Sequence, residues 1–289
     1  MDGILLIDKD KGVTSRDIVN QVIKKFDIKK VGHTGTLDPL ATGVLVVCVG
    51  KATKLVNLIT AKDKEYIASV RLGILTDTLD ISGNILKVEK VDISDDLIIK
   101  AINNMQKTYM QDVPIYSAVK INGKKLYEYA RENINVELPK KEVTIYDISL
   151  VSDINRNNNY IDFKIKCKVS KGTYIRSLIN DLARSLNTIG IMTDLRRIKQ
   201  GNISVDDCKN ILDISPNDLI KPIDILSDFD VVKVDNTLKK DILNGKIILD
   251  KYHKEKVLFI DENNKVLAIY KKYEKENNML KPDIMLGGI

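Results

Sequence analysis

The sequence predicts an α+β protein, with a central sheet of largely antiparallel or mixed strands flanked by helices and a small β-rich domain after it. Strand-like segments that alternate apolar and polar residues are interspersed with separate amphipathic helices, without regular strand–helix alternation. Near the C-terminus, the apolar runs 256–260 and 265–270 flank a polar turn at 261–264, which indicates a hairpin. The length of 289 residues suits one large and one small domain. We expect these over residues 1–225 and 230–289.

The first fifty residues predict a strand, a helix and a core strand. Residues 4–7 are a short apolar run typical of a buried strand. Thr14 and Asp17 have the spacing of a helix cap, and apolar residues recur at helical spacing as far as Phe26. Residues 43–50 (GVLVVCVG) are mostly β-branched and bounded by glycines, which indicates a strand buried on both faces. The helix is expected to cover the sheet.

Two further strands and a helix follow. Residues 64–72 alternate, which places Tyr66 near the beginning of a strand. Ser94, followed by two aspartates, is a typical cap for a helix whose apolar stripe begins at Leu97. Residues 160–169 alternate apolar side chains with charged ones, which predicts an antiparallel strand with one wet face.

A second amphipathic helix follows Gly172 and carries Arg176 near its beginning. Its apolar residues recur at helical spacing and form one stripe, and Arg176 lies off that stripe. We therefore expect the side chain of Arg176 to point into a cleft.

The composition predicts a folded protein in a reducing compartment. Hydrophobic residues make up 44% and charged residues 30% of the chain, which is ordinary globular usage. A net charge of +6 favours a polyanionic partner. Three widely spaced cysteines, no export signal and no segment of transmembrane length predict a cytoplasmic protein without a membrane partner. Two histidines and no cysteine cluster are too few preferred ligands for a transition metal, so no metal is expected.

The most unusual segment is the loop of residues 32–43 (GHTGTLDPLATG). Its glycines permit close approach of the backbone to a ligand, and Pro39 restricts Asp38 to an extended conformation. An Asp before Pro is by itself most often a turn residue. A phosphate-binding loop is another interpretation, but residues 50–53 (GKAT) lack the spacing of a Walker A loop and its Ser or Thr after Lys. Nucleotide hydrolysis is therefore not predicted.

The loop closely resembles the catalytic motif of the TruB family of pseudouridine synthases. Four more segments resemble the family in the same order, namely residues 64–66 (KEY), 114–131 (PIYSAVKINGKKLYEYAR), 170–176 (SKGTYIR) and 195–197 (LRR). One departure is Asp10, where the family usually has a proline, and it removes no residue with a chemical role. The resemblance covers about residues 1–225, and by its position the tail is similar to the family's small RNA-binding PUA domain.

The resemblance implies the pseudouridine synthase fold and the isomerisation of uridine to pseudouridine in the T-loop of tRNA, conventionally at uridine 55. The N-glycosidic bond breaks, the uracil turns and C5 rejoins the sugar, so no cofactor is needed. Asp38 is the implied catalytic carboxylate, either as a nucleophile on the sugar or through its neighbouring proton. Arg176 is the implied catalytic cation that keeps this carboxylate ionised.

The target base must also be flipped out of the folded RNA, which costs about a few kcal/mol of stacking. By resemblance, Tyr66 stacks on the flipped uracil and can help to remove the C5 proton as a further catalytic residue. Tyr174 and Leu195 complete the wall of the pocket. His33 fills the space that the flipped base leaves.

Two other functions stay open at this point. A non-catalytic tRNA-binding or chaperone protein would fit the positive charge, and a guide-dependent pseudouridine synthase would work inside a ribonucleoprotein. The presence of Asp38, Tyr66 and Arg176 favours the enzyme, and guide-dependent relatives usually carry longer extensions. We expect a monomer that acts on the T-arm of tRNA without an obligatory protein partner.

Overall fold

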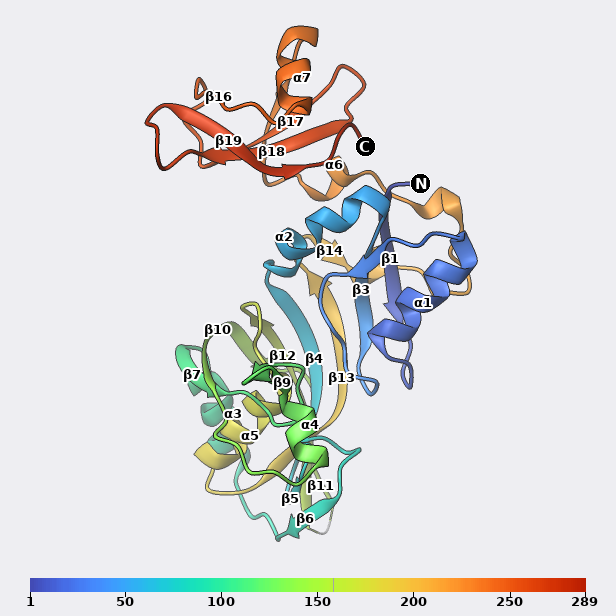
Figure 1. The fold of residues 1–289 in the computed structure, drawn as a ribbon. Helices are drawn as coiled ribbons and strands as arrows, with labels where there is room; N and C mark the ends of the chain where they lie inside the picture. The colour runs from blue at the N-terminus through green and yellow to red at the C-terminus, as the bar shows by residue number, and fades with distance from the viewer. Residues whose placement is uncertain (158) are drawn as a thin grey trace. The chain divides into compact units, whose positions relative to one another are not determined.

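The computed structural model describes residues 1–157 and 159–289 (Figure 1). Its contacts divide the chain into two compact units. Unit 1 comprises Met1–Asp38, Val44–Ala61 and Asp206–Ile289. Unit 2 comprises Pro39–Gly43 and Lys62–Val205. The chain therefore crosses between the units several times, because each unit is assembled from segments far apart in the sequence.

Unit 1 contains two sheets and their helices. Its elements are β1 (Gly3–Lys9), α1 (Ser15–Phe26), β2 (Val31–His33), β3 (Thr42–Val49, whose first two residues belong to unit 2), the 3-10 helix η1 (Gly50–Leu55), α2 (Val56–Thr60), the 3-10 helices η2 (Val205–Asp207) and η3 (Pro216–Asp218), α6 (Pro222–Ile225), β15 (Asp230–Lys233), α7 (Asn236–Leu243), β16 (Ile248–Leu249), β17 (Lys256–Ile260), β18 (Val266–Lys272) and β19 (Met279–Met285).

The N-terminal part of unit 1 confirms the predicted strand, helix and core strand. The capping box of α1 is present, because the Thr14 hydroxyl accepts from the Asp17 N–H and the Asp17 carboxylate accepts from the Thr14 N–H. Strand β3 lies between β1 and β2. Helix α1 covers this sheet through apolar side chains. This core consists of Leu5, Ile7, Ile18, Val22, Leu45, Val47, Val49, Ile211 and Ile214.

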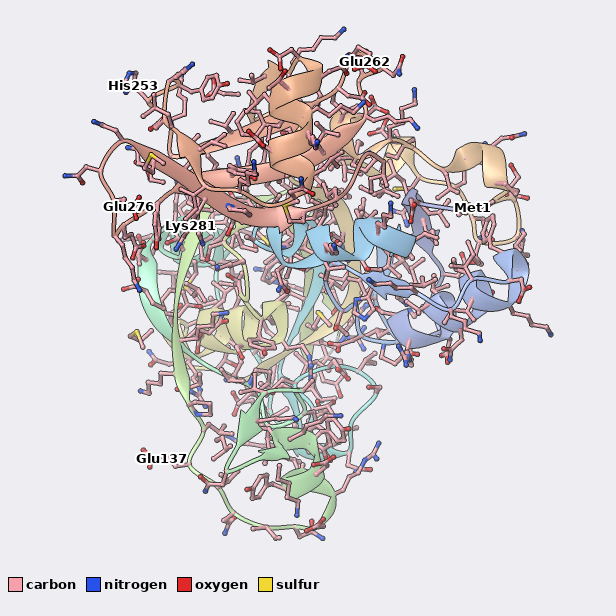
Figure 2. All side chains as sticks on the ribbon, turned by 45° about the horizontal axis from the view of Figure 1, so that its top comes forward. Met1, Glu137, His253, Glu262, Glu276 and Lys281 are labelled. Atoms are coloured by element: carbon pink, nitrogen blue, oxygen red, sulfur yellow. The ribbon has the colours of Figure 1, made fainter. Side chains whose placement is uncertain are left out.

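The C-terminal part of unit 1 is a five-stranded sheet in the order β15-β17-β18-β19-β16. Strands β17 and β18 form the predicted antiparallel hairpin. The Asp261 carboxylate accepts from the N–H of Asn263 and of Lys265, which closes its turn. In Figure 2, Glu262 in this turn lies at the opposite end of the sheet from His253 and Glu276. The sheet has a core of its own, made of Val234, Ile242, Val257, Phe259, Leu267, Ala268, Tyr270 and Leu280.

Unit 2 is a mixed sheet with helices. Its elements are β4 (Lys64–Leu72), β5 (Ile74–Thr76), β6 (Ile85–Val88), α3 (Asp95–Asn104), β7 (Thr108–Asp112), β8 (Lys120–Ile121), β9 (Lys124–Lys125), α4 (Leu126–Arg131), β10 (Lys140–Leu150), β11 (Asn155–Asn157), β12 (Tyr160–Val169), α5 (Ile175–Ser185), β13 (Gly190–Gln200) and β14 (Ile203–Ser204).

The main sheet of unit 2 runs in the order β13-β4-β12-β10-β7, and all four of these pairings are antiparallel. The first residues of β3 add a short parallel pairing, since Thr42 and Gly43 lie opposite Arg196 and Arg197. Helix α5 packs on β13 and β4, and α3 packs on β10 and against α5 (Figure 1). The predicted α+β class, with a largely antiparallel, mixed sheet, is confirmed.

One detail of the sequence prediction is wrong. Leu97 was expected at the start of the buried stripe of α3, but its side chain is 55% exposed. The face that α3 buries carries Ile98, Ala101 and Ile102 instead. When an apolar stripe is wider than the surface on which it packs, the residues at its edge stay exposed. Periodicity alone does not show which residues these are.

Candidate functional site

The predicted catalytic carboxylate lies in unit 1, in a loop whose backbone is fixed next to it. The Leu37 N–H donates to the Ser15 hydroxyl at 2.8 Å, and this hydroxyl donates back to the Leu37 carbonyl at 3.1 Å. Both residues are buried. One serine at the start of α1 therefore holds the residue that precedes Asp38, while the Asp38 side chain itself is half-buried.

His33 lies in the same unit at the end of β2, where it pairs with Val47 of β3. Its Nδ1 accepts a long hydrogen bond of 3.4 Å from the Gly35 N–H. The Thr34 N–H donates to the Val46 carbonyl at 3.0 Å and ties the next residue to β3. His33 is thus placed by strand pairing, and its side chain is half-buried.

The predicted pocket residues Tyr66 and Leu195 lie in unit 2 on one face of the sheet. Tyr66 of β4 pairs with Arg197 of β13, and Ala68 pairs with Leu195. Directly opposed residues on neighbouring strands project to the same side, as do residues two apart along one strand. One face of the two paired strands therefore carries Tyr66, Ala68, Leu195 and Arg197. Tyr66 is 8% and Leu195 6% exposed.

Helix α5 packs on β13 and β4, the two strands that form this face. A Cβ placed on Gly190 would lie 2.9 Å from Leu72 Cδ2 and 3.0 Å from Ala183 Cβ, so the later half of α5 lies over the end of β4. Strand β12, which precedes α5, ends at Val169, opposite Lys64 at the beginning of β4. Tyr174 is the N-cap residue of α5. The first turn of α5 contacts β7, because the Ser177 hydroxyl donates to the Asp112 carbonyl at 2.8 Å.

The N-terminal end of α5 is tied to β7 by a buried polar network. The Tyr174 N–H donates to Gln111 Oε1 at 2.8 Å, and Gln111 Nε2 donates to the Tyr109 hydroxyl at 2.9 Å. That hydroxyl donates to Asp181 of α5 at 3.1 Å. Burial raises the pKa of both Tyr109 and Asp181. Gln111 satisfies a helix-end N–H that has no partner within the helix.

Arg176 does not extend into solvent, although it was placed off the apolar stripe. The residue as a whole is 6% exposed, and its Nη1 and Nη2 donate to the carbonyls of Thr78 and Tyr116 at 3.0 Å each. Its Nε lies 3.8 Å from Asp80 Oδ2. Asp80 is buried too and accepts from the hydroxyl of Thr78 at 2.8 Å. The guanidinium is thus a buried charge with fixed partners.

Within the two units, sequence reasoning missed four residues that lie beside predicted site residues. Ser15 lies between the cap residues Thr14 and Asp17 and, like Asp80, Gln111 and Ser117, was not singled out for a role. The buried hydroxyl of Ser117, one residue after the Tyr116 carbonyl, has no hydrogen-bond partner in the part of the chain that the structure describes. Only Ser117 had a local signal, because it lies within the family-like segment 114–131. The others depend on contacts distant in sequence.

Residues 1–157 and 159–289 contain neither a candidate membrane-spanning helix nor a candidate metal-binding group. No helix in these ranges is long and apolar enough to cross a membrane. Within the same ranges, no group of three or more His, Cys, Asp or Glu side chains is arranged to hold a metal ion.

Comparison with known sequences gives one family. Residues 23–175 match the model of the TruB family pseudouridylate synthase, N-terminal domain. The chain is 43% identical to the tRNA pseudouridine synthase B of Mycoplasma mycoides subsp. mycoides, over 99% of this chain and 97% of the relative. It is 39% identical to the tRNA pseudouridine synthase B of Lactobacillus acidophilus, over 99% of this chain and 98% of the relative.

Solved structures share the fold over nearly the whole chain. A structure of an H/ACA RNP bound to a substrate RNA containing 2'-deoxyuridine superposes with a TM-score of 0.73 at 20% identity, covering 98% of this chain and 84% of that one. A Cbf5-Nop10-Gar1 complex gives a TM-score of 0.69 at 20% identity, covering 98% and 83%. At such identities the likeness is one of fold.

Proposed function

Because the chain belongs to the TruB family of pseudouridylate synthases, we propose that it isomerises uridine to pseudouridine in tRNA, at uridine 55 of the T-loop. Relatives at 43% and 39% identity over nearly their full length are tRNA pseudouridine synthases. The resemblance of residues 32–43 to the family's catalytic motif supports the more specific target, which is the T-arm of tRNA. The reaction needs no cofactor, because the base that leaves the sugar is the base that returns.

Asp38, Arg176 and Tyr66 are the catalytic residues of this proposal. Breaking the glycosidic bond builds positive character at the sugar carbon, which an ionised Asp38 stabilises. Arg176 contributes a permanent positive charge, since a guanidinium keeps its proton at all physiological pH values. Tyr66 offers an aromatic face for the flipped uracil, a contact worth about 1–3 kcal/mol. His33, Tyr174 and Leu195 contact the substrate around them.

The observation that carries the proposal is the sheet face on which α5 packs. Tyr66 and Leu195 are diagonal neighbours on this face, on adjacent strands, and Arg176 lies in the first turn of the helix. A flipped base needs an aromatic or apolar wall, and the reaction needs charge in a place from which water is excluded. An aromatic side chain on this face and a buried guanidinium on the helix that packs on it meet both needs.

Asp38→Asn tests the chemistry, because it keeps the shape of the side chain and removes its charge. Purified protein is incubated with an unmodified tRNA transcript, and pseudouridine is measured by nucleoside mass spectrometry with mapping of the modified position. We expect a loss of roughly a thousandfold or more in rate, with tRNA binding retained. The matched control is Asp27→Asn, an exposed residue of the same unit with a positive φ that Asn tolerates.

The outcomes separate the competing functions. A near wild-type rate for Asp38→Asn would refute the assigned carboxylate. Stable tRNA binding by the wild-type chain with no pseudouridine formed would favour a non-catalytic binding protein. Activity that appears only after a guide RNA and partner proteins are added would favour a guide-dependent enzyme. We propose activity on bare tRNA by a monomer in the cytoplasm.

Residues 230–289 are proposed to be a small PUA-like domain that adds affinity for tRNA. Their five-stranded sheet encloses its own apolar core, in which Phe259 packs edge to face against Tyr252 and Tyr270. Limited proteolysis of the full chain should give a first cut between residues 225 and 230. A first cut within the sheet would contradict the proposed boundary.

A further inference from the structure

Basic side chains gather around Lys64, at the end of the unit 2 sheet where β4 begins. Lys64 lies two residues before Tyr66 and projects to the same face, which also carries Arg197 beside Tyr66. Lys171 lies in the loop between β12 and α5. The ammonium of Lys141 lies against Gly172 in that loop, since a Cβ placed on Gly172 would be only 1.7 Å from it. Three strands and one loop thus contribute four cations.

Two of these cations are withdrawn from water and two are not. Lys64 is 6% and Arg197 1% exposed, whereas Lys141 and Lys171 are exposed. The Lys64 Nζ donates to the Lys62 carbonyl at 2.5 Å. Burial, followed by the charges of Arg197, Lys141 and Lys171 against that of Asp63, lowers the pKa of Lys64 from 10.5 to about 8.

On their own, these clustered positive charges destabilise the folded protein. Like charges in a partly desolvated place repel one another, and burial of an ammonium weakens its hydration. An anion bound among them would relieve both effects. The charge of Asp63 acts in the opposite direction and favours the charged form of Lys64, and the Asp63 carboxylate also accepts a hydrogen bond from the Tyr146 hydroxyl. A feature that costs stability and attracts anions is typical of a binding site.

We propose that Lys64, with Lys171 and Lys141 at the surface and Arg197 beneath, binds one backbone phosphate of the RNA at the nucleotide that stacks on Tyr66. Residues two apart on a strand are about 6.6 Å apart, which is on the order of the distance from a base to the phosphate of its own nucleotide. A phosphodiester carries one negative charge and accepts from several donors, which suits a convergent set of ammonium groups. This inference rests on the proposed function for the identity of the RNA.

In this proposal the neighbouring residues of the sheet face have different roles. Tyr66 and Leu195 offer an aromatic and an apolar surface, which can hold a base of any sequence context. Lys64 and its neighbours offer charge at a fixed distance from that surface. A phosphate held there would fix the position of the sugar between them, which is the part of the nucleotide that reacts.

The test uses the full chain and synthetic T-arm stem-loop RNAs, each with one neutral methylphosphonate linkage at a different loop position. Binding of each RNA is measured by fluorescence anisotropy over a range of salt concentrations, for the wild type and for Lys64→Met. Lys164→Met is the matched control, an exposed lysine that projects from the opposite face of the same sheet. Lys171→Met, at an exposed position of the cluster, gives a second variant whose fold is not at risk.

We expect Lys64→Met to weaken binding of the unmodified RNA roughly fivefold to tenfold and to lower the slope of log K against log salt by about one. With the neutral linkage at one particular loop position, the wild type should lose a similar factor and Lys64→Met should lose nothing more. Lys171→Met should couple to the same position, and Lys164→Met to none. An equal loss for Lys64→Met on every RNA, or wild-type binding by both cluster variants, would overturn the site.

The failure of this inference and that of the proposed function are distinguishable. Pseudouridine formation by the wild type without coupling to any linkage would support the proposed activity and contradict the phosphate site. Coupling to one linkage without pseudouridine formation would support the phosphate site and contradict the proposed activity.

Discussion

Arg176 and Asp80 face each other as a buried pair, with Arg176 Nε 3.8 Å from Asp80 Oδ2 and both side chains 7% exposed. At this distance charge attraction operates without a direct hydrogen bond, because the outer nitrogens of the guanidinium donate to the carbonyls of Thr78 and Tyr116. These partners of the planar group come from two segments far from it in the sequence. Asp80 acts as a positioning residue for Arg176.

Arg176→Lys should reduce activity although the charge is kept. One ammonium cannot reach two carbonyls and a carboxylate in the geometry of a guanidinium, so at least one buried partner loses its donor. We expect a roughly hundredfold lower single-turnover rate and a loss of about 1–3 kcal/mol in the free energy of unfolding. Single-turnover kinetics and chemical denaturation measure these. Arg184→Lys, an exposed arginine on the same helix, is the control and should change neither.

Gln111→Leu should slow the reaction without weakening tRNA binding in proportion. The substitution keeps the volume but leaves the Tyr174 N–H without its acceptor, so the first turn of α5 loses the bond that fixes it. We expect a kcat about tenfold lower and a Kd for the T-arm within about twofold. Tyr109→Phe is the matched comparison, because it removes the bond to Asp181 and keeps the bond from Gln111 to Tyr174. Equal losses in kcat and Kd would mean a general structural defect instead.

Ser117→Ala should separate stability from activity. The buried hydroxyl has no hydrogen-bond partner among the described residues, and an unsatisfied buried hydroxyl costs about 1–3 kcal/mol. Removal of the hydroxyl should therefore leave the melting temperature unchanged or raise it. If the substrate supplies the missing partner, kcat/KM should fall roughly threefold to tenfold at the same time. A variant that loses stability, or one that keeps full kcat/KM, would contradict this role.

Lys64 should make stability depend on pH in the alkaline range. Burial and neighbouring cations lower its pKa from 10.5 to about 8. Below pH 8 it is charged in the folded and unfolded states alike, and the folded state carries the full cost of that charge. As pH rises from about 8 to about 10.5 the unfolded state holds more protons, so stability rises by roughly 3 kcal/mol at most.

Chemical denaturation of the wild type and Lys64→Met across this interval measures the effect. The difference in stability between the two proteins isolates Lys64, since the other titrating groups are common to both. Lys64→Met should be the more stable protein near neutral pH, and its advantage should shrink toward pH 10.5. A constant difference across the interval would show that the cost of burying this ammonium is small.

The sequence by itself determined the local elements and the family. Alternation over 160–169 and 64–72 predicted β12 and β4 at their observed bounds. Successive side chains of a strand point to opposite faces, so a half-buried strand alternates apolar and polar residues. The Thr14 and Asp17 spacing predicted the cap of α1 for a similar reason, since both partners lie within one turn. The loop 32–43 indicated the family through a dense local pattern. Each of these signals is complete within about a dozen residues.

Only the tertiary structure decided which distant residues meet. Tyr66 lies beside Arg197 because β4 pairs with β13, and Arg176 is buried because Asp80 and the carbonyls of Thr78 and Tyr116 come to it from elsewhere in the chain. Local periodicity describes which face of an element is apolar, but a buried polar group is stable only when remote partners satisfy it. Those partners are set by strand order and helix packing, which local sequence patterns do not encode.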